Sequence, residues 1–253
     1  MCLLVLAWNV HPRYSVVLAA NRDEFHERPA AAMDWWKEPP MLAGRDLQAG
    51  GTWLAVDRQG RFGVVTNYRD LQPPKPGAPS RGLLIPRFLG ESAGATAFAA
   101  RIAAEAGQYS GFNLLIGDRV KLSYVTNRAT ERTRELAPGV FGLSNHLLDT
   151  PWPKLVRTRR RFEHLLGNES IATDDLLAML TDREPSPDFD LPDAELPPDL
   201  ERALSAPFIV HQRYGTRCST VVCIAHDGRV AVTEQRYDAG GRTIGRAAFE
   251  FQA

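Results

Sequence analysis

The sequence predicts an α+β fold in which antiparallel β-sheets are layered against each other with helices on the outside. Strand-like runs follow one another in pairs, and helical segments are inserted between the pairs instead of alternating with single strands. Three runs (Cys2–Trp8, 16–20 and 221–225) are apolar at consecutive positions, which requires cover on both faces of a sheet. The chain has no internal repeat and no clean change of composition, so we expect one domain over residues 1–253.

Most of the expected strands pair as hairpins, because a short turn rich in Gly, Pro or Asp separates each run from the next. Three hairpins are predicted, from residues 1–10 with 14–20, 52–57 with 61–66, and 112–116 with 121–126. The turn of the second hairpin is Arg58-Gln59-Gly60, which supplies the glycine that tight turns need. Three more strands are expected late in the chain, at 220–225, 230–235 and 243–251.

Three helices are predicted between these strands, at residues 92–107, 151–167 and 173–180. The first is rich in alanine, the best helix former, and has Gly107 at its end. The second has Thr150 as its N-cap and Pro151 at the first helical position, where proline is favoured. The third has Thr173 as its expected N-cap.

Two segments are too rich in proline to form regular structure. Residues 70–82 contain four prolines and two glycines, and we expect an irregular surface loop there. Residues 184–199 contain five prolines and six acidic residues, and we expect an extended surface excursion.

The composition excludes several functional classes. The 30 basic and 30 acidic residues give no net charge, which argues against a nucleic-acid-binding protein. No run approaches the ~18 apolar residues that would cross a membrane, and the N-terminal run lacks the basic region of a signal peptide. The 3 cysteines suit a reducing compartment and an expected cytoplasmic location, and the 6 scattered histidines predict no metal site.

Cys2 is the strongest catalytic candidate, because it directly follows the initiator Met1. Removal of Met1 leaves a residue that carries both a thiol nucleophile and an α-amine able to act as its base. Reference pKa values of about 8.5 for the thiol and about 7.7–8.0 for the amine let both groups work near neutral pH. The alternative interpretation is a small buried hydrophobe at the start of a strand.

Residues 21–24 (Asn-Arg-Asp-Glu) come where we expect the chain to leave the second strand. A tight first turn pairs Cys2 roughly with Asn21, which brings Arg22 and Asp23 within reach of Cys2. A guanidinium there lowers the pKa of the thiol, and a carboxylate holds the ammonium or positions the amine. The alternative interpretation is a solvated polar turn.

Asn67 and Asn145 each end an expected strand, and an amide in that position can donate to a developing oxyanion. The alternative is an Asx-turn, which is the commoner use of asparagine beside a strand. Arg217 enters a late strand and either lines the same pocket or faces solvent. The residues alone leave both alternatives open.

Together these positions resemble the NRDE family, whose animal members are called transport and Golgi organisation protein 2. The resemblance runs from Met1 to the last strands and is carried by several motifs in family order. They are Met1-Cys2, Asn21 to Glu24, Gly50-Gly51-Thr52-Trp53, Thr66-Asn67-Tyr68-Arg69, Ser80-Arg81-Gly82, Gly111 to Leu115, Leu143-Ser144-Asn145, Asp149 to Lys154 and Tyr214-Gly215-Thr216-Arg217.

The resemblance implies an N-terminal nucleophile hydrolase-like fold, a four-layer αββα sandwich, related to the choloylglycine hydrolases and penicillin V acylases. It implies that Cys2 is the nucleophile and its α-amine the base, with Arg22 and Asp23 beside them. Three further catalytic positions are implied, with Asn67 and Asn145 around the oxyanion and Arg217 as the late arginine. The expected activity is hydrolysis of a linear amide or thioester through an acyl-Cys2 intermediate.

The same resemblance implies an alternative, a non-catalytic protein that binds and moves haem, acyl-CoA or lipid with the same pocket. We expect no required cofactor, and any haem would bind non-covalently because the chain has no CxxCH motif. The expected partner in either case is a small amide, acyl or haem-like ligand and not a nucleic acid.

Overall fold

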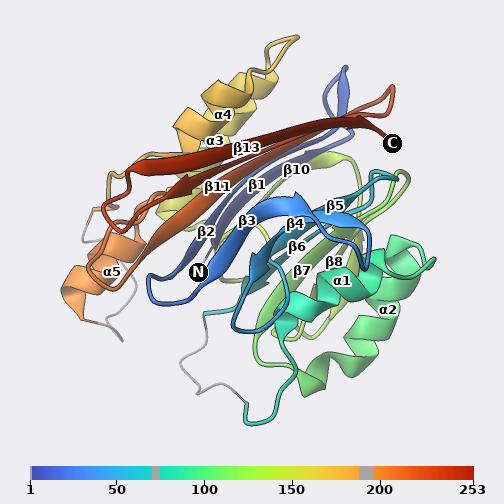
Figure 1. The fold of residues 1–253 in the computed structure, drawn as a ribbon, viewed down its shortest axis with the longest axis horizontal. Helices are drawn as coiled ribbons and strands as arrows, with labels where there is room; N and C mark the ends of the chain where they lie inside the picture. The colour runs from blue at the N-terminus through green and yellow to red at the C-terminus, as the bar shows by residue number, and fades with distance from the viewer. Residues whose placement is uncertain (1, 70–74, 188–196) are drawn as a thin grey trace.

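Two antiparallel β-sheets packed face to face form the middle of the molecule, with helices on both outer faces (Figure 1). The computed structural model describes residues 2–69, 75–187 and 197–253. The six-stranded sheet contains, in spatial order, β10 (Gly139–Leu143), β1 (Cys2–Trp8), β2 (Tyr14–Phe25), β11 (Tyr214–Ala225), β12 (Arg229–Tyr237) and β13 (Thr243–Gln252). The seven-stranded sheet contains β3 (Ala30–Trp35), β4 (Met41–Asp46), β5 (Leu54–Asp57), β6 (Phe62–Asn67), β7 (Phe112–Gly117), β8 (Leu122–Thr126) and β9 (Thr133–Leu136).

Helices cover the two outer faces. On the seven-stranded sheet lie α1 (Leu84–Leu89) and α2 (Ala95–Glu105), flanked by the short helices η1 (Arg81–Leu83) and η2 (Ala106–Gln108). On the six-stranded sheet lie α3 (Pro153–Leu166) and α4 (Thr173–Leu180), and α5 (Pro198–Leu204) lies near one end of that sheet. The order helix, sheet, sheet, helix confirms the expected α+β sandwich.

Alternate residues of the central strands enter different hydrophobic cores. Leu4 and Leu6 of β1 belong to the core between the two sheets, whereas Leu3 and Val5 pack in the core beneath α3 and α4. Because successive side chains of a strand point to opposite faces, cover on both faces permits apolar residues at every position. The sequence-based reason for a layered sandwich is therefore confirmed.

The strand β2 extends further than expected. It continues through residues 21–24 to Phe25, so the prediction that the chain leaves the sheet at this motif is wrong. The extension is possible because β11 pairs with β2 as far as Tyr214 opposite Phe25. The pairing of β1 with β2 is also shifted by one residue from the prediction, so that Cys2 lies opposite Arg22.

The remaining predicted elements are found with small changes at their ends. The hairpins β5–β6 and β7–β8, the helix α2 and the three late strands are all present. The helix α3 begins at Pro153, so the expected start at Pro151 with Thr150 as N-cap is wrong, and Trp152 occupies the N-cap. Similarly, Ala172 is the N-cap of α4 in place of Thr173.

Four strands were not predicted, namely β3, β4, β9 and β10. Short helices also begin in the two proline-rich segments, η1 at Arg81 within 70–82 and α5 at Pro198 within 184–199. Of these two segments, residues 70–74 and 188–196 lie outside the described part of the chain. No helix among the described residues is both long and apolar enough to span a bilayer.

Candidate functional site

The candidate site lies where β1 begins, beside β2, with β11 on the far side of β2. In the strand register Cys2 is opposite Arg22, and on the other side of β2 Arg22 is opposite Cys218. Thr216 is opposite Asp23, and the register slips between Thr216 and Cys218. The structure describes the backbone of Cys2, and its role as a nucleophile stays a prediction.

Arg22 points into the space between the two sheets. Its side chain is only 5 % exposed, and its guanidinium carbon lies 4.3 Å from the centre of the Trp53 ring. Its Nη2 atom is 3.8 Å from Oδ2 of Asp46. Its buried Nη1 makes no hydrogen bond within the described part of the chain. Because nearly all buried polar groups are hydrogen-bonded, this unsatisfied donor is a candidate contact for a ligand or a reacting group.

Asp46 lies beside two arginines, Arg22 and Arg28. Its Oδ2 accepts a hydrogen bond from Nε of Arg28 at 2.8 Å. Burial alone would favour the neutral acid, but hydrogen bonds from the backbone N–H of Ala49 and from Arg28 lower the pKa of Asp46 below its usual value. Asp46 is therefore a carboxylate held between two arginines.

Asp23 faces the opposite side of β2, toward the helical layer, and is only 1 % exposed. Its Oδ1 accepts a hydrogen bond from Oγ1 of Thr216 at 2.7 Å, and its backbone oxygen accepts one from the hydroxyl of Tyr214 at 2.8 Å. Burial raises the pKa of Asp23, and the nearby charges of Lys154 and Arg22 oppose that rise. The alternation of side chains along a strand thus places Arg22 and Asp23 in different layers.

Asn21 fastens the same strand to the helical layer. Its Oδ1 accepts a hydrogen bond from Oγ of Ser219 at 2.6 Å. Its Nδ2 donates to the carbonyl oxygens of Leu180 and Pro207, at 2.9 Å in both cases. This amide is fully engaged in holding β2, β11 and the end of α4 together.

Asn67, the last residue of β6, and Asn145, two residues beyond the end of β10, lie side by side. Nδ2 of Asn145 donates to the backbone oxygen of Asn67 at 2.9 Å. Asn145 comes two residues after Leu143, which pairs with Leu4, so the chain here runs toward the start of β1. Asn145 is 3 % exposed and has a φ of 58°, a left-handed conformation that asparagine tolerates better than most residues. The structure thus brings both predicted asparagines to one place.

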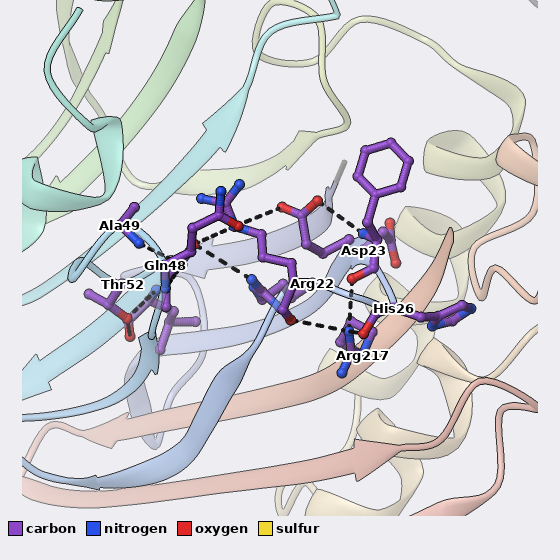
Figure 2. A network of polar contacts seen from close by, with 12 residues as sticks. Arg22, Asp23, His26, Gln48, Ala49, Thr52 and Arg217 are labelled. Atoms are coloured by element: carbon purple, nitrogen blue, oxygen red, sulfur yellow. Dashed lines mark hydrogen bonds and ion pairs between the residues drawn. The ribbon is translucent and has the colours of Figure 1, made fainter. Parts of the chain in front are cut away.

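Arg217 organises the turn that follows β2. Its Nη1 donates to the carbonyl oxygens of Phe25 and His26, at 2.9 and 3.0 Å. Burial lowers the pKa of Arg217, and the nearby charge of Arg22 acts in the same direction. Arg217 lies close to Arg22 (Figure 2). It is not among the residues that line the pocket beside Arg22.

A pocket of about 300 Å³ opens beside Arg22. Its wall brings together the 50–53 and 80–82 motifs, since the backbone N–H of Thr52 donates to the oxygen of Gly82 at 3.0 Å. A Cβ atom on Gly51 would lie 2.4 Å from the carbonyl carbon of Gly82, so this approach requires glycine. The charged residues of the lining are Arg22, Asp23, Glu24, Arg28, Asp46, Lys75 and Arg81.

Several residues of the site were not singled out from the sequence. Trp53 stacks on Arg22, and Asp46 pairs with it. Lys154 is buried in the first turn of α3, and its Nζ donates to the oxygen of Leu204 at 2.6 Å. Trp53 and Lys154 lie in family motifs that could have pointed to them, whereas Asp46 carried no sequence signal.

Glu234 of β12 is a buried carboxyl group near this cluster. Its Oε1 accepts the backbone N–H of Met33 at 2.8 Å, which ties the two sheets together. Burial raises the pKa of Glu234, with a hydrogen bond from Met33 as the largest opposing effect. No group of His, Cys, Asp and Glu side chains in the described residues is arranged to hold a metal ion.

The chain is similar to members of one protein family in sequence and to a solved structure in fold. The family described as Transport and Golgi organisation 2 matches residues 1–239. The Transport and Golgi organization protein 2 homolog of Bos taurus is 35% identical over 257 residues, covering 93% of this chain and 92% of the relative. The Mus musculus homolog is 33% identical over 257 residues with the same coverage, 93% and 92%. Among solved structures, the Caenorhabditis elegans ortholog of N-acylethanolamine-hydrolyzing acid amidase has a similar fold, with a TM-score of 0.51 at 9% identity over 87% of this chain and 92% of that chain.

Proposed function

The chain belongs to the transport and Golgi organisation 2 family and has an N-terminal nucleophile hydrolase-like fold, and from these two facts we propose that it hydrolyses a linear amide or thioester. The reaction would pass through an acyl intermediate on Cys2. The observation that carries the proposal is the buried guanidinium of Arg22, which has an unsatisfied Nη1 and lies opposite Cys2 in the strand register.

The proposed chemistry begins with removal of Met1, which frees the α-amine of Cys2. The amine accepts the thiol proton as Sγ attacks the carbonyl carbon, and the proton then passes to the leaving amine or thiol as the substrate bond breaks. Water, deprotonated by the same amine, attacks the acyl-Cys2 carbonyl and releases the carboxylic acid. Sγ leaves as a thiolate and regains a proton.

The surrounding residues suit this sequence of steps. The positive charge of Arg22 favours a thiolate, because an opposite charge nearby favours the ionised form of an acid. The buried carboxyl group of Asp23 suits a role in holding the α-ammonium group. Asn67 and Asn145, brought together by a hydrogen bond, suit an oxyanion site, in which one donor is typically worth about 10²–10³ in rate.

A second candidate function is the binding of an anionic acyl ligand, such as an acyl-CoA, without turnover. The observation that favours it is the lining of the pocket, in which four basic residues (Arg22, Arg28, Lys75 and Arg81) outnumber three acidic ones (Asp23, Glu24 and Asp46).

The test is acylation of the purified protein by a panel of activated acyl thioesters and amides, followed by intact-mass spectrometry and product analysis. We expect loss of Met1 and an acyl adduct on the wild-type protein, and no adduct on Cys2→Ala. The matched control is Cys223→Ala, which removes a buried thiol from the core beneath α3 and α4 and should still be acylated.

Turnover by Cys2→Ala at the wild-type rate would overturn the hydrolase proposal. Saturable binding of an acyl-CoA that survives Cys2→Ala, with no turnover by either protein, would instead support the second candidate.

A further inference from the structure

The outer edge of β13 differs from the other sheet edges of this fold. The free edge of β10 is covered, because the backbone N–H of Asp149 donates to the oxygen of Gly142 at 2.8 Å, and Gly142 donates back to Oδ1 of Asp149 at 2.8 Å. The edge strand β3 has an irregular register, with a shift between Ala31 and Asp34. The edge strand β9 has only 4 residues. Short length, bulges and covering segments are the usual devices that prevent edge-to-edge pairing.

The strand β13 has none of these devices over most of its length. From Gly245 to Gln252 it pairs one-to-one with β12, without a bulge. Within the described part of the chain no strand lies beyond it in the sheet, and it forms the outer edge in Figure 1. This stretch contains neither lysine nor proline.

The hydrogen bonds to β12 determine which backbone groups face outward. The N–H of Ala253 donates to the oxygen of Gly228, so the odd-numbered residues of this stretch point their backbone groups toward β12. The backbone groups of the even-numbered residues therefore point to the free edge. Their side chains share the exposed outer face of the sheet, and they are Arg246, Ala248, Glu250 and Gln252.

We propose that β13 pairs with β13 of a second copy of this chain, antiparallel and centred on Ala248. A two-fold axis through Ala248 places Arg246 of each copy opposite Glu250 of the other, so both ion pairs form at once. Opposite charges directly across an antiparallel pair stabilise it, and all the paired backbone groups are those that face the free edge. The two six-stranded sheets then join into one continuous antiparallel sheet.

Within one chain Arg246 already contacts α4, where its Nη2 lies 2.7 Å from Oδ1 of Asp174. Both side chains of this pair are well exposed, and such pairs contribute little to stability. The planar guanidinium has five N–H donors, so it can contact Asp174 and a second carboxylate together.

The test is sedimentation velocity of the full chain and three charge variants across micromolar concentrations. We expect the wild type to form a dimer that dissociates on dilution. Arg246→Glu and Glu250→Arg each place two like-charged pairs across the interface and should weaken the dimer about tenfold. The double variant Arg246→Glu with Glu250→Arg restores opposite charges and should recover most of the affinity.

Two more variants separate pairing from general effects on the fold. Ala248→Pro removes an N–H that points to the free edge, so it should abolish the dimer while circular dichroism remains that of the folded chain. Asp174→Asn breaks the contact of Arg246 within one chain and should leave the dimer unchanged. A wild type that stays monomeric throughout, or a dimer unaffected by both charge reversals, would overturn the proposal.

Discussion

The guanidinium carbon of Arg22 lies 4.3 Å from the centre of the Trp53 ring, so a residue of one sheet stacks on a residue beside the other sheet. A cation over an aromatic face is stabilised by about 0.5–2 kcal/mol, more when the pair is removed from water. The contact joins the 21–24 motif to the 50–53 motif. It also holds the charge of Arg22 at the rim of the candidate pocket.

Gly44 of β4 makes room for this stacking, and its replacement tests the contact. A Cβ atom at this position would lie 2.4 Å from two carbon atoms of the Trp53 ring. We expect Gly44→Ala to lower the free energy of unfolding by about 1–3 kcal/mol, because the rigid indole must move. Denaturant unfolding measures this change. The matched control is Gly107→Ala, where an added Cβ meets nothing within 4 Å, and an equal loss in both variants would contradict the explanation.

Asn145 allows its backbone strain to be separated from the role of its amide. At a φ of 58°, alanine should cost about 1–2 kcal/mol more than glycine, since glycine adopts this conformation freely. We therefore expect Asn145→Gly to be the more stable of the two variants in thermal unfolding. Both lose the amide that donates to Asn67, so both should lose turnover equally if the amide acts at the oxyanion. Full activity of Asn145→Gly would exclude that role.

The buried carboxyl group of Glu234 should make stability depend on pH. Its pKa lies above the usual value of 4.5, so the folded chain binds this proton more tightly than the unfolded chain does. The contribution of Glu234 to the free energy of unfolding is fully present below pH 4.5 and is lost as the pH rises through the raised pKa. We expect Glu234→Gln, which keeps an acceptor for the backbone N–H of Met33, to lack this decrease in stability with rising pH. Unfolding by denaturant from acid to neutral pH measures the difference between the two proteins.

The control for this prediction is Glu105→Gln, for which the sign is opposite. A hydrogen bond from Arg87 lowers the pKa of Glu105, so its contribution is present above its usual value and is lost as the pH falls through the lowered pKa. A wild type and a Glu234→Gln variant with parallel pH profiles would show that Glu234 titrates normally.

Arg22 should activate Cys2 if the proposed function is right. Removing its charge by Arg22→Met should raise the pKa of the Cys2 thiol and slow its alkylation near neutral pH by about tenfold or more. Peptide-resolved mass spectrometry of iodoacetamide labelling follows Cys2 separately from the other thiols. Arg101→Met, which changes an exposed arginine of α2, is the control and should leave the rate unchanged. The rate is measured as a function of pH. If the pH at which alkylation of Cys2 is half-maximal were the same in Arg22→Met and in the wild type, Arg22 would have no electrostatic role at Cys2.

The sequence by itself determined the local features of the fold. Consecutive apolar residues in β1 showed that both faces of the strand are covered, and Arg58-Gln59-Gly60 marked the turn between β5 and β6. The motif residues were also recognisable, with Cys2 behind Met1 and Asn67 and Asn145 near strand ends. Turn chemistry and side-chain periodicity act over a few residues, so they can be read along the chain.

Only the tertiary structure decided how these features meet. The 21–24 motif stays in β2 because β11, almost two hundred residues away in the chain, supplies the hydrogen-bonding partner. The register of β1 against β2 differs by one residue from the prediction, and a one-residue change reverses the face of every side chain. The Arg22–Trp53 stack and the Asn67–Asn145 hydrogen bond each join the two sheets. Such contacts depend on how the layers pack, and no local pattern in the sequence encodes that packing.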